Sequence, residues 1–142
     1  MSTTYFARVM AEPEGGFTIT FDGLEGVSFA PSEAAIDGRA HDLLATILAA
    51  AIGDGRPLPE PGSFLAGTRP VALDALTTAK LGLRRAMQEA GISGRELARR
   101  LGIGETAARR ILDLDHRSRI EQVEAALGAL GKRLDAVVRD AA

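Results

Sequence analysis

Arginines and small polar side chains gather between residues 93 and 119, and proteins use these side-chain types to read DNA. Arginine donates two hydrogen bonds to guanine O6 and N7, glutamate accepts from the cytosine N4 amine, and threonine or alanine contacts a thymine methyl. We predict base contacts from Thr106 and Arg109. We predict phosphate contacts from Ser93, Arg95, Arg99, Arg117 and Ser118. The predicted DNA-binding residues are Ser93, Arg95, Arg99, Gly104, Glu105, Thr106, Ala107, Arg109, Arg110, Arg117 and Ser118.

A pair of short helices must hold these side chains. Ser93 and Glu96 have the spacing of a capping box, which predicts a helix that starts after Ser93. Gly102 can end that helix with a positive φ, and Ile103 is expected to fill the turn. A second helix is predicted over 105–112. Two short helices joined by a tight glycine turn favour a helix-turn-helix, whose second helix enters the major groove.

These charges also have simpler interpretations. Glu105 and Arg109 lie four residues apart, so they can form an ion pair on the helix surface instead of contacting bases. Arginine is also common on exposed helix faces that have no binding function. A single helix-turn-helix reads only a few base pairs, so sequence-specific binding requires a homodimer or a higher homo-oligomer.

Carboxylates in the first 25 residues are the other group that could do chemistry. Hydrolysis with two metal ions needs several carboxylates that converge on one site. The first predicted strand carries none, Asp22 comes only at the end of the second, and Glu12, Glu14 and Glu25 fall in predicted turns. We therefore predict no catalytic residue, no metal site and no cofactor.

Charge is distributed unevenly along the 142 residues. Residues 1–70 carry four arginines against nine acids, whereas residues 71–142 carry thirteen basic residues against ten acids. The net charge of -2 thus combines an acidic half with a basic half, which suggests two partners of opposite charge. We predict two domains, 1–70 and 71–142.

Composition favours a reducing compartment. Cysteine is absent, which excludes disulfides and thiolate metal sites and suits the cytoplasm. The N-terminus shows no basic region followed by an apolar core, and the longest apolar stretch, 43–52, is too short to span a bilayer. We expect a cytoplasmic protein with no membrane partner.

Period-two alternation predicts a small β-sheet in the first half. Strands are expected over 5–11 and 17–21, with a hairpin turn at Gly15 and Gly16, and a short third strand over 27–29. A fourth strand is expected at 69–73, returning to the same sheet. The sheet and a long helix then make up an α+β domain.

Helical periodicity predicts most of the remaining chain. The long helix is expected to open at Ser32, as its N-cap, and to stop at the glycines of 53–55, before a proline-rich connector. Further helices are predicted over 76–90 and 119–130, and 134–138 is expected to form a short helix or a strand that meets a second subunit. The spaced apolar residues here are either core or the seam of a dimer: Ile120, Val123, Leu127, Leu130, Leu134 and Val137.

The order of these motifs resembles the HicB antitoxin family. Similarity to its N-terminal domain lies in the first strand, in the run Glu12-Pro-Glu-Gly-Gly-Phe-Thr-Ile-Thr-Phe21 with Asp22-Gly-Leu-Glu-Gly26, and in the helix followed by Asp54-Gly-Arg-Pro-Leu-Pro-Glu-Pro61. Residues 80–112 resemble the Cro/lambda-repressor-like helix-turn-helix of one branch of that family. The pairing of the two parts makes the resemblance specific.

This chain departs from the family pattern at two places. It has Asp22-Gly-Leu-Glu-Gly-Val27 where the family often has P-D-L-P-G-C. It has Phe29-Ala-Pro-Ser-Glu-Ala-Ala-Ile36 where a T-x-G-D-T-x-E-E-A helix start is common. Residues available to a partner therefore differ, and the cognate toxin is not expected to match that of another member.

The resemblance implies an N-terminal domain similar to a reduced RNase H fold without its activity, followed by an all-α helix-turn-helix domain. It implies an antitoxin, not an enzyme, that neutralises a HicA-type mRNA endonuclease and represses its own operon by binding operator DNA. An acidic domain can cover a basic RNA-binding toxin by electrostatic mimicry. On this hypothesis the toxin-binding residues are Glu12, Glu14, Asp22 and Glu25.

Two other functions stay open from the residues alone. One is a stand-alone transcriptional regulator, whose N-terminal domain oligomerises or senses a ligand. The other is a residual nuclease. A small basic reading frame beside the gene would favour the antitoxin over the regulator, and metal-dependent cleavage by the purified protein would favour the nuclease.

Overall fold

The computed structural model describes residues 4–140. The chain forms two compact units, and the boundary between them in the sequence lies between Leu73 and Asp74. Each unit buries apolar side chains of its own. The expected boundary at residue 70 falls inside the last strand of the first unit, Thr68–Val71, because pairing with the first strand extends to Val71. The functions assigned to the two halves stay predictions.

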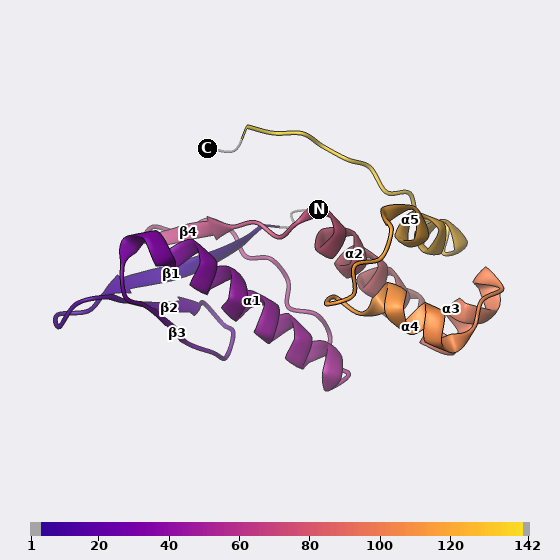
Figure 1. The fold of residues 1–142 in the computed structure, drawn as a ribbon, viewed down its shortest axis with the longest axis horizontal. Helices are drawn as coiled ribbons and strands as arrows, with labels where there is room; N and C mark the ends of the chain where they lie inside the picture. The colour runs from indigo at the N-terminus through magenta and orange to yellow at the C-terminus, as the bar shows by residue number, and fades with distance from the viewer. Residues whose placement is uncertain (1–3, 141–142) are drawn as a thin grey trace. The chain divides into compact units, whose positions relative to one another are not determined.

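A four-stranded antiparallel sheet in the order β3-β2-β1-β4 forms the base of the first unit (Figure 1). Its strands are β1 (Tyr5–Ala11), β2 (Phe17–Phe21), β3 (Ser28–Ala30) and β4 (Thr68–Val71). A tight turn joins β1 to β2, where Gly15 and Gly16 take positive φ values that disfavour other residues. The predicted hairpin, the short third strand and the return of the fourth strand to the sheet are confirmed.

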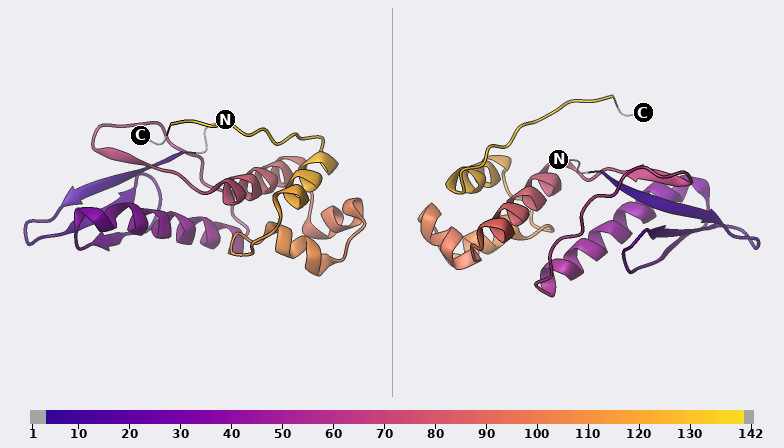
Figure 2. Two further views of the ribbon diagram at one scale, coloured as in Figure 1. Left: turned by 45° about the horizontal axis from the view of Figure 1, so that its top comes forward. Right: turned by 180° about the vertical axis from the view of Figure 1, so that it is seen from behind.

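One long helix, α1 (Ile36–Gly53), covers one face of this sheet (Figure 1). Figure 2 shows the helix lying against the strands from two further directions. The helix side of the core is supplied at helical spacing, and the sheet side by alternate residues of the strands. Fully or almost fully buried here are Tyr5, Ala7, Ile19, Phe21, Ala30, Ile36, Ala40, Leu44, Leu48 and Ala51.

The start of α1 differs from the prediction. Ser32 makes no side-chain capping bond, so its assignment as the N-cap of the long helix is wrong. A 3₁₀ turn, η1 (Glu33–Ala35), comes first, closed by the Ala35 N–H donating to the Ser32 carbonyl at 3.1 Å. Because this turn occupies the backbone, the α-helix begins only at Ile36. The predicted stop after Gly53 is confirmed.

Four helices form the second unit: α2 (Ala75–Ala90), α3 (Gly94–Leu101), α4 (Glu105–Leu112) and α5 (Ile120–Ala129). Asp74 caps α2 by accepting from the backbone N–H of Thr77 at 2.9 Å. Gly91, with φ of 65°, ends the helix as predicted. The apolar faces of all four helices share one core, made of Ala79, Leu83, Ala86, Met87, Leu97, Ile111, Leu112, Val123, Ala126 and Leu127.

The chain after α5 corrects a second expectation. Val123 and Leu127 lie in the core, which favours the intradomain interpretation over a dimer seam for these two residues. Gly131, at φ 72°, ends the helical course, and residues 132–140 adopt neither helix nor strand. The predicted short element at 134–138 is therefore wrong. Leu134 packs partly on the core, whereas Val138 is 98% exposed, and contact of this segment with a second subunit stays a prediction.

Candidate functional site

The turn between α3 and α4 positions the predicted DNA-contacting side chains. Ser93 caps α3, because its Oγ accepts from the backbone N–H of Glu96 at 3.2 Å. Gly102, at φ 66°, ends the helix, and the Ile103 N–H donates to the Ala98 carbonyl at 3.0 Å. This backbone bond closes the turn and leaves the Ile103 side chain 36% exposed, so its predicted role as a plug is wrong.

The second of the two helices, α4, buries one face and exposes the other. Ala108, Ile111 and Leu112 enter the core at the spacing that a helix requires, as predicted. All of the residues predicted to contact DNA from this helix are exposed: Gly104, Glu105, Thr106, Ala107, Arg109 and Arg110. The structure thus brings these six residues together on the exposed face of one short helix and its N-cap.

Arg99, which is predicted to contact a phosphate, and its neighbour Arg100 both pair with Glu96 on α3. Arg99 donates to the carboxylate of Glu96 through Nε at 2.8 Å and through Nη2 at 2.6 Å, and Arg100 donates through Nε at 3.1 Å. These hydrogen bonds lower the pKa of Glu96 to about 2. Glu96 therefore neutralises part of the basic face instead of completing the predicted capping box.

Glu105 pairs across the turn rather than along its own helix. Its Oε1 accepts from Nε of Arg95 at 3.0 Å, which joins the starts of α3 and α4. The alternative pair of Glu105 with Arg109 is therefore wrong. Among the described residues, the guanidinium groups of Arg109 and Arg110 form no ion pair. These two arginines keep their donors for a ligand.

Sequence reasoning missed the side chain that anchors the far end of α4. Lys80, on α2, is fully buried, and its Nζ donates to the carbonyls of Arg110 at 3.1 Å, Asp113 at 2.6 Å and His116 at 2.6 Å. Burial lowers the pKa of Lys80, the Asp113 carboxylate raises it, and Arg117 lowers it. A cation at the carbonyl end of a helix also interacts favourably with the helix dipole.

The loop after α4 uses some of its predicted phosphate ligands internally. The Ser118 hydroxyl donates to the Arg110 carbonyl at 3.1 Å and lies 3.0 Å from Nδ1 of His116. Arg117 approaches Asp74 at 4.0 Å from an exposed position. Ser118 therefore shapes the loop, and of the two predicted loop ligands Arg117 is the one whose side chain is more accessible.

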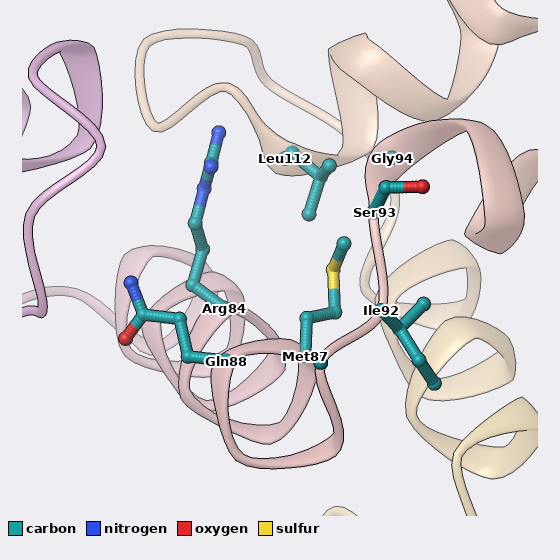
Figure 3. A pocket seen from close by; sticks show the side chains of 8 residues that line it. Arg84, Met87, Gln88, Ile92, Ser93, Gly94 and Leu112 are labelled. Carbon is teal, nitrogen blue, oxygen red and sulfur yellow. The ribbon is translucent and has the colours of Figure 1, made fainter.

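A cavity of about 400 Å³ opens between α2 and the start of α3 (Figure 3). Arg84 and Met87 rise into it from α2, toward Leu112. Nε of Arg84 is buried without a hydrogen-bond partner, and burial lowers the pKa of this arginine while Asp113 opposes the shift. The lining combines the apolar side chains of Met87, Ile92 and Leu112 with the polar side chains of Arg84, Gln88 and Ser93.

The four acids proposed for toxin binding do not converge on one site. Glu12 and Glu14 belong to the turn between β1 and β2, whereas Asp22 and Glu25 follow the far end of β2. A strand of five residues places these ends about 17 Å apart. Asp22 accepts from Arg8 at 2.8 and 2.6 Å, and this pairing lowers the pKa of the Asp22 carboxyl.

The histidine, aspartate and glutamate side chains of residues 4–140 nowhere come together in a group of three that could hold a metal ion. The helices of the same described part of the chain include none with the length and apolar character that crossing a membrane requires.

Comparison with known proteins assigns the chain to a family. Residues 4–82, which include the whole sheet and α1, match the family described as HicB_like antitoxin of bacterial toxin-antitoxin system. This chain belongs to the HicB-like antitoxin family. The HicB-like match ends within α2, so it covers the first unit and only the beginning of the second.

Named relatives extend the likeness. The HicB-like chain is 42% identical over 103 residues to Antitoxin HicB of Pseudomonas fluorescens (strain Pf0-1), covering 72% of this chain and 70% of the relative. It is 29% identical over 135 residues to Antitoxin HicB of Escherichia coli (strain K12), covering 94% and 98%. Antitoxin HicB 2 of Photorhabdus laumondii is 36% identical over 98 residues, 69% of each chain. The alignment with the Escherichia coli protein spans both units.

Proposed function

We propose that this HicB-like protein is an antitoxin that neutralises a HicA-type mRNA endonuclease through its first unit and represses its own operon through its second. Membership of the antitoxin family is the observation that carries the proposal. The protein acts by binding and not by catalysis, in the cytoplasm, where both the toxin and the operator are found.

The acidity of the first unit supports the antitoxin half. Four arginines stand against nine acids in residues 1–70, and a protein that binds messenger RNA must present a basic surface. The sheet of four antiparallel strands with one helix on it is proposed as a reduced RNase H-like fold. Its acids are spread over two ends of β2, which disfavours the two-metal nuclease.

The exposed face of α4 supports the DNA-binding half. We propose that α3 and α4 form a helix-turn-helix of the Cro/lambda-repressor type, with Thr106 and Arg109 at base edges. The unpaired arginines of α4 and the accessible Arg117 supply the positive charge that attracts phosphates. A homodimer places two such helices about one helical turn of DNA apart.

Co-expression tests the antitoxin half. The chain is produced together with the product of the small reading frame that adjoins its gene, and growth and co-purification are measured. The neighbour alone is expected to arrest growth, and the pair to restore growth and to purify as a complex. No toxicity and no complex would remove the antitoxin function and would leave a stand-alone regulator as the alternative.

Binding to the upstream region of its own gene tests the repressor half. Fluorescence anisotropy with a labelled fragment is expected to show a specific complex whose affinity falls steeply with salt, because cations are released from the phosphates. A scrambled fragment of equal length serves as the control. Equal affinity for both fragments would contradict sequence-specific repression.

A further inference from the structure

The face of the sheet opposite α1 carries an exposed row of side chains. Antiparallel pairing aligns Met10 of β1 with Thr18 of β2, and Thr18 with Phe29 of β3. Because side chains alternate between faces, these three point away from the face that buries Ile19 and Ala30. Met10 is 57% exposed and Phe29 is 50% exposed, about 10 Å apart across two strand spacings.

The Phe29 ring is held in place from beneath. A Cβ built on Gly16 would lie 2.3 Å from Cζ of Phe29 and 3.0 Å from the Ala30 carbonyl oxygen, so the ring rests directly on the glycine backbone. Only a residue without a side chain permits this contact. Half of the aromatic surface is therefore packed and fixed, while the other half stays open to a partner.

A groove beside Phe29 combines an aromatic ring with two carboxylates. It has a volume of about 580 Å³ and is lined by Glu12, Pro13, Glu14, Gly15 and Phe29. The Glu12 carboxylate accepts a hydrogen bond from the Thr18 hydroxyl, which holds it next to the exposed row. An aromatic face next to carboxylates suits a cation on an apolar stem, which is the side chain of arginine or lysine.

At the other end of the same sheet face, side chains of the first unit contact one another. Phe64 lies edge-on against Phe6, with ring centroids 5.9 Å apart. Arg8 neutralises Asp22 through two hydrogen bonds. At the opposite end of this face, the exposed side chains of Met10 and Phe29 lie beside the carboxylates of the β1–β2 turn, Glu12 and Glu14.

We propose that Met10, Phe29, Glu12 and Glu14 form the surface that binds the toxin, and that the toxin places an arginine or lysine between the Phe29 ring and the two carboxylates. This proposal rests on the antitoxin function proposed above. Charge selects the occupant: the carboxylates repel the phosphates of a nucleic acid, and the acidic first unit repels a second copy of itself. A basic RNA-binding protein is complementary to both features of the surface.

The four acids predicted from the sequence to bind the toxin thus fall into two pairs. Glu12 and Glu14 belong to the binding surface, whereas Asp22 is engaged by Arg8 and Glu25 lies beyond the opposite end of β2. It also adds two apolar residues, Met10 and Phe29. Apolar and aromatic side chains at the centre of an interface commonly contribute more affinity than the charges at its rim.

Calorimetry with the full chain and the purified product of the adjacent reading frame tests the aromatic anchor. Phe29→Ala is expected to weaken binding by at least about 30-fold, as for a buried aromatic anchor of an interface. Phe64→Ala is the matched control, because Phe64 is 65% exposed at the other end of the same sheet face. It is expected to change binding less than about 3-fold, as most interface-distant residues do. Met10→Ala is a second variant that does not alter Phe29.

Alanine substitutions at two neighbouring glycines provide a sharper test of the position of the Phe29 ring. Gly15 and Gly16 both have positive φ, so alanine strains the backbone at either position. Only at Gly16 would the new methyl displace the Phe29 ring, since nothing lies within 4 Å of a Cβ at Gly15. Gly16→Ala is therefore expected to weaken toxin binding at least about 10-fold more than Gly15→Ala, in line with the loss of a fixed aromatic anchor.

The contribution of the carboxylates to toxin binding is measured as the rate at which the two proteins associate. Glu14→Gln is expected to slow association several-fold at low salt and to lose this effect at high salt, whereas Glu25→Gln is expected to match the wild type. If the wild-type chain does not bind the neighbour's product, both the antitoxin function and this surface fail. If the wild type binds but Phe29→Ala, Met10→Ala and Glu14→Gln bind equally well, the antitoxin function stands and this surface is wrong.

Discussion

The two units use charged side chains in opposite ways. In the first unit the ion pairs lie at the surface, as between Arg8 and Asp22, and none of its described charged side chains is buried. In the second unit the fully buried Lys80 donates hydrogen bonds to three backbone carbonyls. We therefore expect substitutions of charged residues to destabilise the second unit more than the first.

Replacement of the buried lysine should give the largest difference between the units. Lys80→Met leaves three carbonyl groups without their donor, and we expect a loss of about 2–4 kcal/mol of unfolding free energy. Urea denaturation measures it. Operator binding is expected to fall with it, while toxin binding persists.

The control for this variant is Lys132→Met, which removes an exposed lysine that lies 3.9 Å from Glu89. Little change in stability is expected, because exposed pairs contribute weakly. Equal stability of the two variants would mean that water replaces the Lys80 ammonium, and the contrast between the units would disappear.

Removal of the Arg109 side chain should have the next largest effect, and this effect should be confined to DNA binding. Arg109→Ala is expected to weaken operator binding by about 10- to 100-fold, the cost of losing a bidentate contact to guanine. Toxin binding should not change. Anisotropy measures the affinity, and Arg139→Ala, an exposed arginine of the C-terminal segment, is the matched control. A uniform loss across all DNA sequences would instead assign Arg109 to a phosphate.

The pH dependence of the second unit should show a smaller effect, through Glu96. The pKa of Glu96 is about 2 in the folded protein against an ordinary value of 4.5, so its ion pairs stabilise the fold above pH 4.5. This contribution is lost as the pH falls toward 2. A melting-temperature difference between the wild type and Glu96→Gln is therefore expected at pH 7 and should vanish near pH 2. A difference that does not depend on pH would indicate packing instead of charge.

The exposed pair of the first unit should contribute least. Asp22→Asn removes the carboxylate that Arg8 binds, but both side chains are partly in water and can be hydrated there. No measurable change in unfolding or in toxin binding is expected. Urea denaturation at low and at high salt provides the measurement. A loss of stability comparable to that of Lys80→Met would show that the two units do not differ in this way.

Periodicity predicted the elements well because each one buries a regular face. The β1–β2 hairpin, the stop after Gly53 and the limits of α3 and α4 follow from local patterns of apolar residues and glycines. The start of α1 and the segment at 134–138 were missed because they depend on backbone bonding and on available surface, which a pattern of residue types does not contain.

The site was less predictable, because its decisive contacts are long-range. Nothing near Lys80 in the sequence marks it as buried, since its acceptors lie 30 to 36 residues later. The pairing of Glu105 with Arg95 likewise crosses the turn, where helical spacing had offered only Arg109. The row of Met10, Thr18 and Phe29 was available from the alternation, but only the register between strands shows that the three are neighbours.

The contacts of Lys80 with the end of α4 also affect the order in which parts of the second unit fold. Its three acceptors exist as a set only after α4 and the loop behind it have formed and docked on α2. Until then a charged ammonium that is still hydrated must stay outside the core. We therefore expect this contact to form after the main folding barrier, so that its loss mainly accelerates unfolding. Lys80 would then stabilise the docked position of α4 mainly by slowing unfolding.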